Sequence, residues 1–532
     1  MDPSLPEANA IAVRGDRIVE VGTLESLRPW LDAHEHHVDD QFAEAVILPG
    51  LIDPHVHPSM MAMLMATEWI TPEAWDLPGR EIPATVGRDS YLARLAEIED
   101  AHPSGRPLVS FGWHRQFHGE VVRADLDALS TARPILVWGR SFHEICCNVA
   151  GLELVEAAEG AAWDPHIDLE TGRMWESGMA WALQRLRPLL LDEGRYEVLM
   201  EEVAQMVHRG GVTTIADAGF GGMALPDREL EVLAKVHEGD QVPFRQYLIP
   251  QVATFKRVYG AEAEDRIAGL PEHSSERIRF LRAGKFFADG AFIAQLMQLG
   301  EPGYIDGHEG AWMAEPDRLV QQLRPTWEAG RQVNVHVNGD LGVDATLDAI
   351  AQLIAETPRF DHRTVLHHFG VSTQAQSRRA AALGCAVQAN GYYLRFFGDQ
   401  FAAEGLGSER ASQMTRVGSA RRNGMSVALH SDLPMGPLEP LLAASVMATR
   451  LSQSGVVLGE HERLSPYDAI AAVTIEPAWQ LFLDHEIGSL AAGKLADATV
   501  IDGDPFAMDP AHWPDIGIEA TMLSGRVYPI SQ

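Results

Sequence analysis

The chain has 532 residues, and its 42 Lys and Arg against 75 Asp and Glu give a formal net charge of −33. At roughly 100–200 residues per domain this length exceeds one small domain, whereas a barrel of about 250 residues with insertions would fit. So negative a charge repels phosphate backbones and anionic lipid, which argues against nucleic-acid and membrane-surface roles. Apolar residues make up 46% of the chain, enough for a large core.

The three cysteines, Cys146, Cys147 and Cys385, are too few for a disulfide framework and are expected as buried residues in a reducing compartment. No stretch approaches the roughly 18–20 apolar residues of a membrane span. The N-terminus lacks a basic region followed by an apolar one, so no secretory signal is expected. These features predict a cytoplasmic protein.

Short strands are expected at both ends of the chain. Residues 8–23, ANAIAVRGDRIVEVGT, are two alternating runs joined at a glycine-containing turn, which predicts a hairpin. Residues 487–506 and 518–530 are β-branched runs broken by Gly and Asp. We expect residues 1–48 and 485–532 to form one composite β-sandwich domain; the alternative is that either end is a separate appendage.

Between these ends, short apolar runs alternate with amphipathic helical stretches such as residues 315–330 and 372–384. The expected strands lie within residues 46–57, 211–219, 244–250, 282–290, 331–340, 363–370, 384–391 and 425–434. Strands that alternate with helices indicate a parallel sheet. Eight of them, with no glycine-rich nucleotide loop after the first, favour an α/β fold of the (β/α)8 TIM-barrel type over residues 49–484.

The first two expected strands are separated by about 150 residues, far more than one crossover helix. The intervening residues, roughly 59–205, contain apolar runs and helical stretches of their own. They predict an insertion or lid subdomain on the loop after the first strand. Because this loop opens on the catalytic face of a barrel, we expect the insertion to cover the site.

The motif LPGLIDPHVHP, residues 48–58, places two histidines at the end of the first expected strand. Residues i and i+2 of a strand point to one side, so His55 and His57 can chelate a transition metal together. The pair alone is weak evidence, but later strands also end in residues able to hold a metal. These are Lys285, His336, His368 and Asp432. The alternative for Asp432 is a capping role through its carboxylate.

The other residues have structural alternatives as well. Lys285 could pair with Asp289, and His336 could be a hydrogen-bonded core histidine. His367 and His368 are neighbours in a strand, so we expect at most one of them to face the barrel mouth. Catalytic residues nevertheless collect at the strand ends of barrels, and so many coincidences there favour a metal site.

These residues carry a resemblance to the amidohydrolase superfamily of metal-dependent hydrolases, and specifically to its YtcJ-like branch, which includes N-substituted formamide deformylases. The resemblance covers nearly the whole chain. AIAVRGDRIVEVG resembles the opening sheet, LPGLIDPHVHP the first strand and IGSLAAGKLADATVIDGDP the closing signature. In the insertion, RPILVW and DLETGRMWE match the pattern of the branch.

The resemblance implies one or two Zn²⁺ or similar divalent ions. Their ligands would be His55, His57, Lys285, His336, His368 and Asp432. The first two would hold the more buried metal, and the two later histidines the second. Lys285 would bridge both metals after carboxylation by CO₂, because an unmodified ammonium cannot ligate. Asp432 would also act as the general base.

The chain departs from this branch at three places. It has His367-His368 where the branch usually has Glu-His, and residues 291–298 are uncharged where an Arg-Thr pair is typical. GWHRQFH, residues 112–118, carries histidines where relatives have an acidic residue near the tryptophan. All three changes leave the ligands intact, and the absence of the Arg points to a less anionic substrate. The expected substrate contacts are Trp113, His114, Asn148 and Tyr392, with helix capping as the alternative for Asn148.

We expect hydrolysis of a non-peptide carbon–nitrogen bond in an amide, N-formyl or cyclic amide compound that has an apolar or aromatic part. A bound metal lowers the pKa of water from 15.7 to about 7; Asp432 would accept the proton, and His143 would donate to the oxyanion. The same ligands could serve ester or lactone hydrolysis, deamination, decarboxylation or isomerisation, although Lys285 favours the binuclear hydrolases. A more remote alternative is a non-enzymatic binding protein. The resemblance also implies a homo-oligomer.

Overall fold

The computed structural model describes residues 7–103, 105–192 and 194–530. Two compact units can be distinguished within them. The first unit contains the chain up to His57, then Ala204–Gly290, and then the residues from Leu296 onward; the second unit contains Pro58–Val203 and Ala291–Gln295. No helix among the described residues is long and apolar enough to cross a membrane.

The eight strands predicted for the central part of the chain are all present in the first unit, which confirms the predicted alternation with helices. They are β4 (Leu51–Val56), β12 (Val212–Phe220), β13 (Arg245–Pro250), β15 (Ala283–Phe287), β16 (Gln332–Val337), β17 (Val365–His368), β18 (Ala386–Asn390) and β19 (Val427–His430). An additional short strand, β14 (Ile278–Phe280), lies beside β13. The strands form two parallel sheets, in the orders β14-β13-β12-β4 and β15-β16-β17-β18-β19.

Backbone contacts join the two sheets at both of their ends. A parallel bridge pairs Gln251, just after β13, with Lys285 of β15. At the other end, the backbone N–H of Asp432 donates to the carbonyl of His55 at 3.0 Å, and that of His57 donates to the carbonyl of Leu433 at 2.9 Å. The carboxyl ends of β4 and β19 are therefore neighbours, although some 370 residues separate them in the sequence.

The parallel strands are buried along almost their whole length, as expected for strands covered by helices on one side and by side chains of other strands on the other. Helices such as α13 (Pro316–Glu328), α14 (Asp340–Glu356) and α15 (Gln374–Ala382) connect them. α15 begins with a capping box, in which Thr373 and Gln376 exchange side-chain to backbone hydrogen bonds. This local signal fixes the start of α15 after β17.

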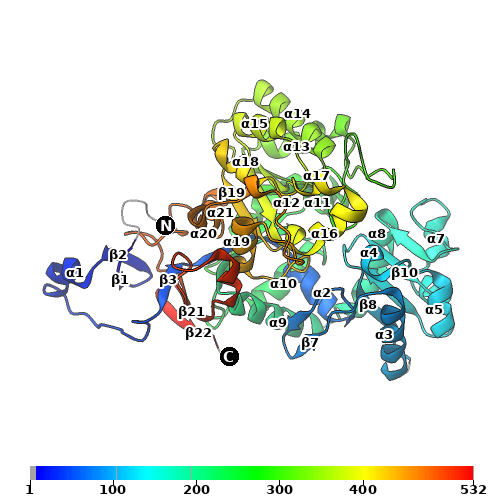
Figure 1. The fold of residues 1–532 in the computed structure, drawn as a ribbon, viewed down its shortest axis with the longest axis horizontal. Helices are drawn as coiled ribbons and strands as arrows, with labels where there is room; N and C mark the ends of the chain where they lie inside the picture. Colours follow the sequence, from blue (N-terminus) through cyan, green and yellow to red (C-terminus); the bar gives the residue numbers. More distant parts are fainter. Residues whose placement is uncertain (1–6, 104, 193, 531–532) are drawn as a thin grey trace. The chain divides into compact units, whose positions relative to one another are not determined.

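The terminal strands lie together in the first unit. β1 (Ala10–Arg14) and β2 (Arg17–Gly22) form the predicted antiparallel hairpin. A second sheet has the order β22-β21-β20-β3, in which β3 (Val46–Pro49) pairs with β20 (Ala498–Ile501). Figure 1 draws β3 in blue beside the red β21 (Ile518–Leu523) and β22 (Arg526–Pro529). The two ends of the chain thus share one sheet.

The second unit has its own sheet and core. The order of its strands is β11 (Arg173–Trp175), β10 (Glu144–Cys147), β9 (Ile135–Gly139), β8 (Leu108–Trp113) and β5 (Glu68–Trp69). Tyr91, Leu95, Leu108 and Leu126 are among the residues of its hydrophobic core, and each is 0% exposed. This enclosed core explains why the inserted sequence contains apolar runs of its own.

Candidate metal centre

Three predicted ligands meet where β4 and β19 end. His55 Nε2 lies 3.2 Å from His57 Nε2, so the two imidazoles do converge on one point. The Asp432 Oδ1 atom is 3.3 Å from His55 Nε2 and 3.2 Å from His57 Nε2. Burial disfavours the charged form of Asp432, but the hydrogen bond with His57 and the charges of His57, His430 and Lys285 together outweigh it and lower the pKa of Asp432 below its usual value. The site therefore keeps an ionised carboxylate next to two imidazoles.

The backbone conformation at the end of β17 contradicts one expectation. His367 and His368 were expected to point in opposite directions, yet their rings lie 4.3 Å and 4.9 Å from the ring of His55. The reason is that His368 has φ of 71° and Phe369 has φ of 48°, so the alternation of an extended strand ends at His368. His368 Nδ1 lies 3.8 Å from Asp432 Oδ2. Both histidines thus belong to one cluster.

Lys285 is 1% exposed, and its partner is not Asp289. Its Nζ lies 2.6 Å from His367 Nδ1, and burial lowers the pKa of Lys285 to about 7. The Asp289 carboxylate instead accepts hydrogen bonds from the backbone N–H groups of Gln298, Asn338 and Gly339. The alternative of a Lys285–Asp289 pair is therefore wrong, because the Asp289 carboxylate binds the backbone of the loop after β16.

His336 lies beside the same cluster. Its ring centroid is 4.5 Å from that of His368, and its Nε2 lies 2.9 Å from the side-chain nitrogen of Asn338. Five of the six residues predicted as ligands, all except Lys285, thus contact one another as imidazoles or through Asp432. Lys285 contacts this cluster through His367.

The donor set fits a divalent transition metal. Among the described residues, two groups have ligand atoms within 4.8 Å of one another: His55, His57 and Asp432, and His55, His368 and His430. The Nδ1 atoms of His55 and His368 are buried without a hydrogen-bond partner in the described part of the chain. Burial lowers the pKa of both histidines well below 6.5, so both imidazoles are neutral, the form that binds metal.

Several residues of the cluster were not predicted from the sequence. His430 precedes Asp432 by two positions, so strand alternation could have identified it as it did His55 and His57; its ring stacks on that of His55 at 4.6 Å. Asp217, within β12, has its Oδ1 3.7 Å from His57 Nδ1. Burial opposes a charge on His57, but Asp217 and Asp432 outweigh it and raise its pKa to about 9. The positive charge on His57 is thus favoured by its two neighbouring carboxylates.

Tyr393 hydrogen-bonds to the carboxylate of Asp432, and Asp53 connects the two strands that carry the site. The hydroxyl of Tyr393 donates to Asp432 Oδ2 at 3.2 Å. Asp53 accepts from the backbone N–H groups of His55 and Ser431, at 3.2 Å and 3.0 Å, and so ties β4 to β19. Burial raises the pKa of Asp53 to about 7. The sequence signal for Asp53 was its place two residues before His55, and that for Tyr393 was the aromatic run after β18.

His143 lies in the second unit, on the loop before β10. Its Nδ1 is 3.2 Å from both carboxylate oxygens of Glu176, and the backbone N–H of Glu176 donates to the carbonyl of His143 at 3.0 Å. Burial opposes ionisation of Glu176, but His143 outweighs this effect and lowers the pKa of Glu176 below 4.5. Phe142 and Glu176 both have positive φ, at 67° and 45°. The pair is thus held by backbone as well as by side chains.

Asn148 has the helix-capping role that was given as its alternative. It is fully buried; its Oδ1 accepts from the backbone of Ile135 and of Gly151, and its Nδ2 donates to the carbonyls of Ser130 and Arg133. These four hydrogen bonds use the whole capacity of the amide, which caps α6 (Val149–Leu154).

The other expected substrate contacts differ in their surroundings. Trp113 is 2% exposed and packs in the core of the second unit, where its indole donates to the carbonyl of Gly119; we assign it a structural role. His114 caps α4 (Arg115–His118) by accepting from the backbone N–H of Gln116 at 3.3 Å. Tyr392, in the first unit, is half-buried and stacks on Phe396. Substrate contacts by His114 and Tyr392 stay predictions.

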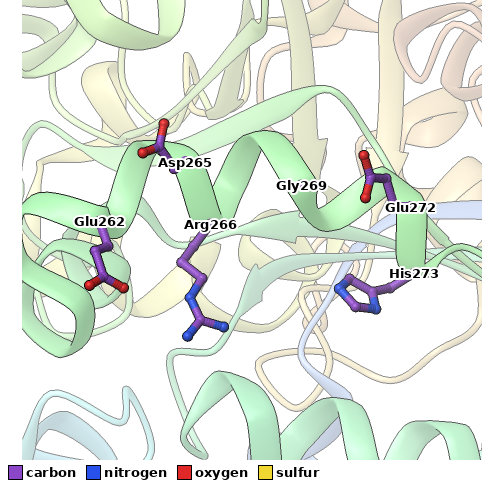
Figure 2. A pocket seen from close by; sticks show the side chains of 6 residues that line it. All are labelled: Glu262, Asp265, Arg266, Gly269, Glu272 and His273. Atoms are coloured by element: carbon purple, nitrogen blue, oxygen red, sulfur yellow. The ribbon is translucent and has the colours of Figure 1, made fainter.

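A separate hollow on the first unit has no part in this cluster. It has a volume of about 340 Å³ and is lined by Glu262, Asp265, Arg266, Gly269, Glu272 and His273, on α12 (Ala263–Gly269) and its flanking turns. Figure 2 shows these charged side chains spread along the helix, without convergence on one point. None of the clustered histidines lines this hollow.

Comparison with known proteins agrees with the ligand pattern. The model of the amidohydrolase family named Amidohydro_3 matches residues 43–529. The amidohydrolase YtcJ of Bacillus subtilis is 26% identical over 501 residues, covering 91% of this chain and 89% of its own. An N-substituted formamide deformylase of Arthrobacter pascens is 23% identical over 529 residues, covering 97% and 94%.

A solved structure shares the fold. The crystal structure of a metal-dependent hydrolase from Pyrococcus horikoshii covers 94% of this chain and 95% of its own, with a TM-score of 0.71 at 19% identity. A likeness at this identity supports the α/β architecture alone. Because the family model spans most of the sequence, the chain belongs to the amidohydrolase family.

Proposed function

We propose that this amidohydrolase uses a metal site to hydrolyse a non-peptide carbon–nitrogen bond, in an amide, N-formyl or cyclic amide substrate. The observation that supports it most is the buried cluster of histidines around the carboxylate of Asp432, in which the imidazoles of His55 and His368 are neutral. N-formyl compounds enter the proposal through the similarity to an N-substituted formamide deformylase.

The metal would be held by six side chains of the first unit. These are His55, His57, Lys285, His336, His368 and Asp432, with Zn²⁺ as the expected ion. When bound, one or two such ions lower the pKa of water and polarise the carbonyl. Lys285 would serve as a ligand after its neutral amine adds CO₂ and releases a proton, which gives a carbamate whose oxygens could bind the metal.

The chain's own residues supply the proton transfers. Asp432 would take the proton from the attacking water and return it to the leaving nitrogen. Tyr393 donates to one oxygen of Asp432, so the other oxygen is directed to the histidines. His143, oriented by Glu176, would donate a hydrogen bond to the tetrahedral oxyanion. His114 and Tyr392 would contact the substrate, which has an apolar or aromatic part.

The domain arrangement is also a proposal. The eight parallel strands would close into a (β/α)8 barrel between residues 49 and 484, with residues 59–205 as its lid. Residues 1–48 and 485–532 would form the composite β-sandwich. The bridge at Lys285 and the backbone hydrogen bonds between His55 and Asp432 support closure at the two sheet ends.

Protein purified without a chelator should contain one or two equivalents of a divalent metal, measured by elemental analysis. Removal of the metal should abolish hydrolysis, and added Zn²⁺ should restore it, because an uncharged water is a poor nucleophile toward an amide. A panel of N-formyl amines, cyclic amides and lactones would identify the substrate class. Full activity of metal-free protein on any of these would contradict the proposed function.

The variant His143→Leu should lower kcat about 100-fold, the usual cost of losing one oxyanion donor. His166→Leu is the matched control, since its Nδ1 contacts Ser177 at 2.7 Å in the same unit. Steady-state kinetics on the best substrate of the panel would measure both. Equal kcat values for His143→Leu and the wild type would remove His143 from the mechanism.

The variant Glu176→Gln should lower the free energy of unfolding at pH 7 by about 1 kcal/mol, because it removes a charged hydrogen bond to His143. The pKa of Glu176 is lowered in the folded protein. Its contribution is therefore present above its unfolded pKa and is lost as the pH falls through its folded pKa. Urea unfolding of both proteins at pH 7 and below pH 4 would test this; a difference that does not shrink in acid would contradict it.

A further inference from the structure

A chain of hydrogen bonds connects two backbone carbonyls to His367 through the buried side chains of Gln332 and Asn334. Gln332, the first residue of β16, is 3% exposed, and its Nε2 donates to the carbonyls of Arg363 and Gln480, both at 2.7 Å. Its Oε1 lies 3.3 Å from Asn334 Nδ2. Asn334 Oδ1 in turn lies 3.2 Å from Nε2 of His367.

The two carbonyls determine the direction of every bond in this chain of hydrogen bonds. A carbonyl only accepts, so the amide nitrogen of Gln332 must face Arg363 and Gln480, and its oxygen must face Asn334. The nitrogen of Asn334 then donates to Gln332, which leaves its oxygen to accept from His367. Nε2 of His367 must therefore carry the hydrogen, and Nδ1 is left as an acceptor.

Lys285 is the group that this acceptor meets. Its Nζ lies 2.6 Å from His367 Nδ1, and Lys285, His367 and Asn334 are each at most 1% exposed. Lys285 therefore donates and His367 accepts. A carboxylated lysine keeps one hydrogen on its nitrogen, so the same hydrogen bond can persist after modification.

We infer that His367 is a positioning residue for Lys285, held as the acceptor tautomer by Asn334 and Gln332; the inference rests on the proposed role of Lys285 as a metal ligand. Both ring nitrogens of His367 are used in this chain of hydrogen bonds, so β17 supplies one ligand, His368, rather than two. Lysine has a flexible four-carbon stem, and without this partner its nitrogen would be buried unsatisfied and free to change rotamer. This role assigns a function to His367, which stands where the branch usually has a glutamate.

The experiment compares the binding of the second metal ion in three variants of the full chain. Zn²⁺ content and the dissociation constant of the second equivalent are measured by competition with a chelator, with Lys285→Met as the reference for a lost ligand. His367→Leu should weaken the second equivalent about 10- to 100-fold, the usual effect of removing a group that orients a ligand. His367→Gln should stay within about threefold of the wild type, because its amide can accept from Lys285 and donate to Asn334.

His362→Leu is the matched control. His362 is 2% exposed and also uses both ring nitrogens, toward Thr364 Oγ1 and the carbonyl of Leu383, each at 2.8 Å. It should lose stability without a change in metal affinity. Asn334→Leu, which leaves His367 in place but removes its acceptor, should weaken the second metal in the same direction and serves if His367→Leu does not fold.

Unchanged metal binding by His367→Leu or Asn334→Leu, with loss of one ion in Lys285→Met, would overturn the inference and leave the proposed function intact. Equal weakening by His367→Gln and His367→Leu would also overturn it, since the hydrogen bonds would then not matter. Retention of both ions by Lys285→Met would overturn the ligand role of Lys285 and the inference together. Wild-type protein that binds no metal would instead reject the proposed function itself.

Discussion

The variant Asp432→Asn is expected to lower kcat/KM about 1,000-fold, within the range for loss of a general base. An amide cannot accept the proton of the attacking water at neutral pH, whereas the pKa of Asp432 lies below 3.8 and its carboxylate is ionised there. The change preserves the size of the side chain. Its oxygen could still accept from Tyr393, so the loop after β19 should keep its structure.

Kinetics and metal content of Asp432→Asn should be measured together, because the same carboxylate contacts His55 and His57. Assays at saturating Zn²⁺ separate loss of the base from loss of metal. Asp344→Asn, at an exposed position of α14, is the matched control and should behave as the wild type. If Asp432→Asn with full metal content keeps wild-type kcat, another residue must be the base.

The variant Lys285→Met is expected to lose one of two metal ions and to lower kcat/KM more than about 100-fold. Methionine fills a similar volume but cannot be carboxylated or donate to His367. Metal polarisation of a carbonyl is worth several kcal/mol of the barrier, and each tenfold change in rate corresponds to about 1.4 kcal/mol.

Elemental analysis and steady-state kinetics on the same sample of Lys285→Met test this expectation. Lys235→Met, in the last turn of α10 (Pro226–Val236), is the control for loss of a lysine outside the site. The ratio of metal to protein should fall by one equivalent in Lys285→Met only. A variant that keeps both ions and full activity would show that Lys285 is no ligand.

Much of the first unit could be predicted because its signals are local. Apolar runs between helix caps and glycine turns identified eight of the nine described strands in the two parallel sheets, and the pairing of β3 with β20 agrees with the strands expected at both ends. The short strand β14 and the membership of residues 291–295 in the second unit could not be predicted, because they depend on contacts distant in sequence.

In the candidate site, too, local sequence signals predicted some features and missed others. Period-two alternation and strand ends identified His55, His57 and Asp432, whose atoms do lie within 3.3 Å of one another. The same rule failed at His368, where a positive φ turns the side chain back toward His55.

The sequence by itself determined the alternation of strands and helices, the HxH motif and the residue types available for metal binding, since each is a property of neighbouring residues. Only the tertiary structure decided that Lys285 hydrogen-bonds to His367 rather than to Asp289. It likewise decided that the side-chain amide of Asn148 makes all its hydrogen bonds with backbone groups. It also decided the tautomer of His367, through carbonyls of Arg363 and Gln480. Burial selects hydrogen-bond partners that are far apart in sequence, because a buried polar group without a partner costs free energy.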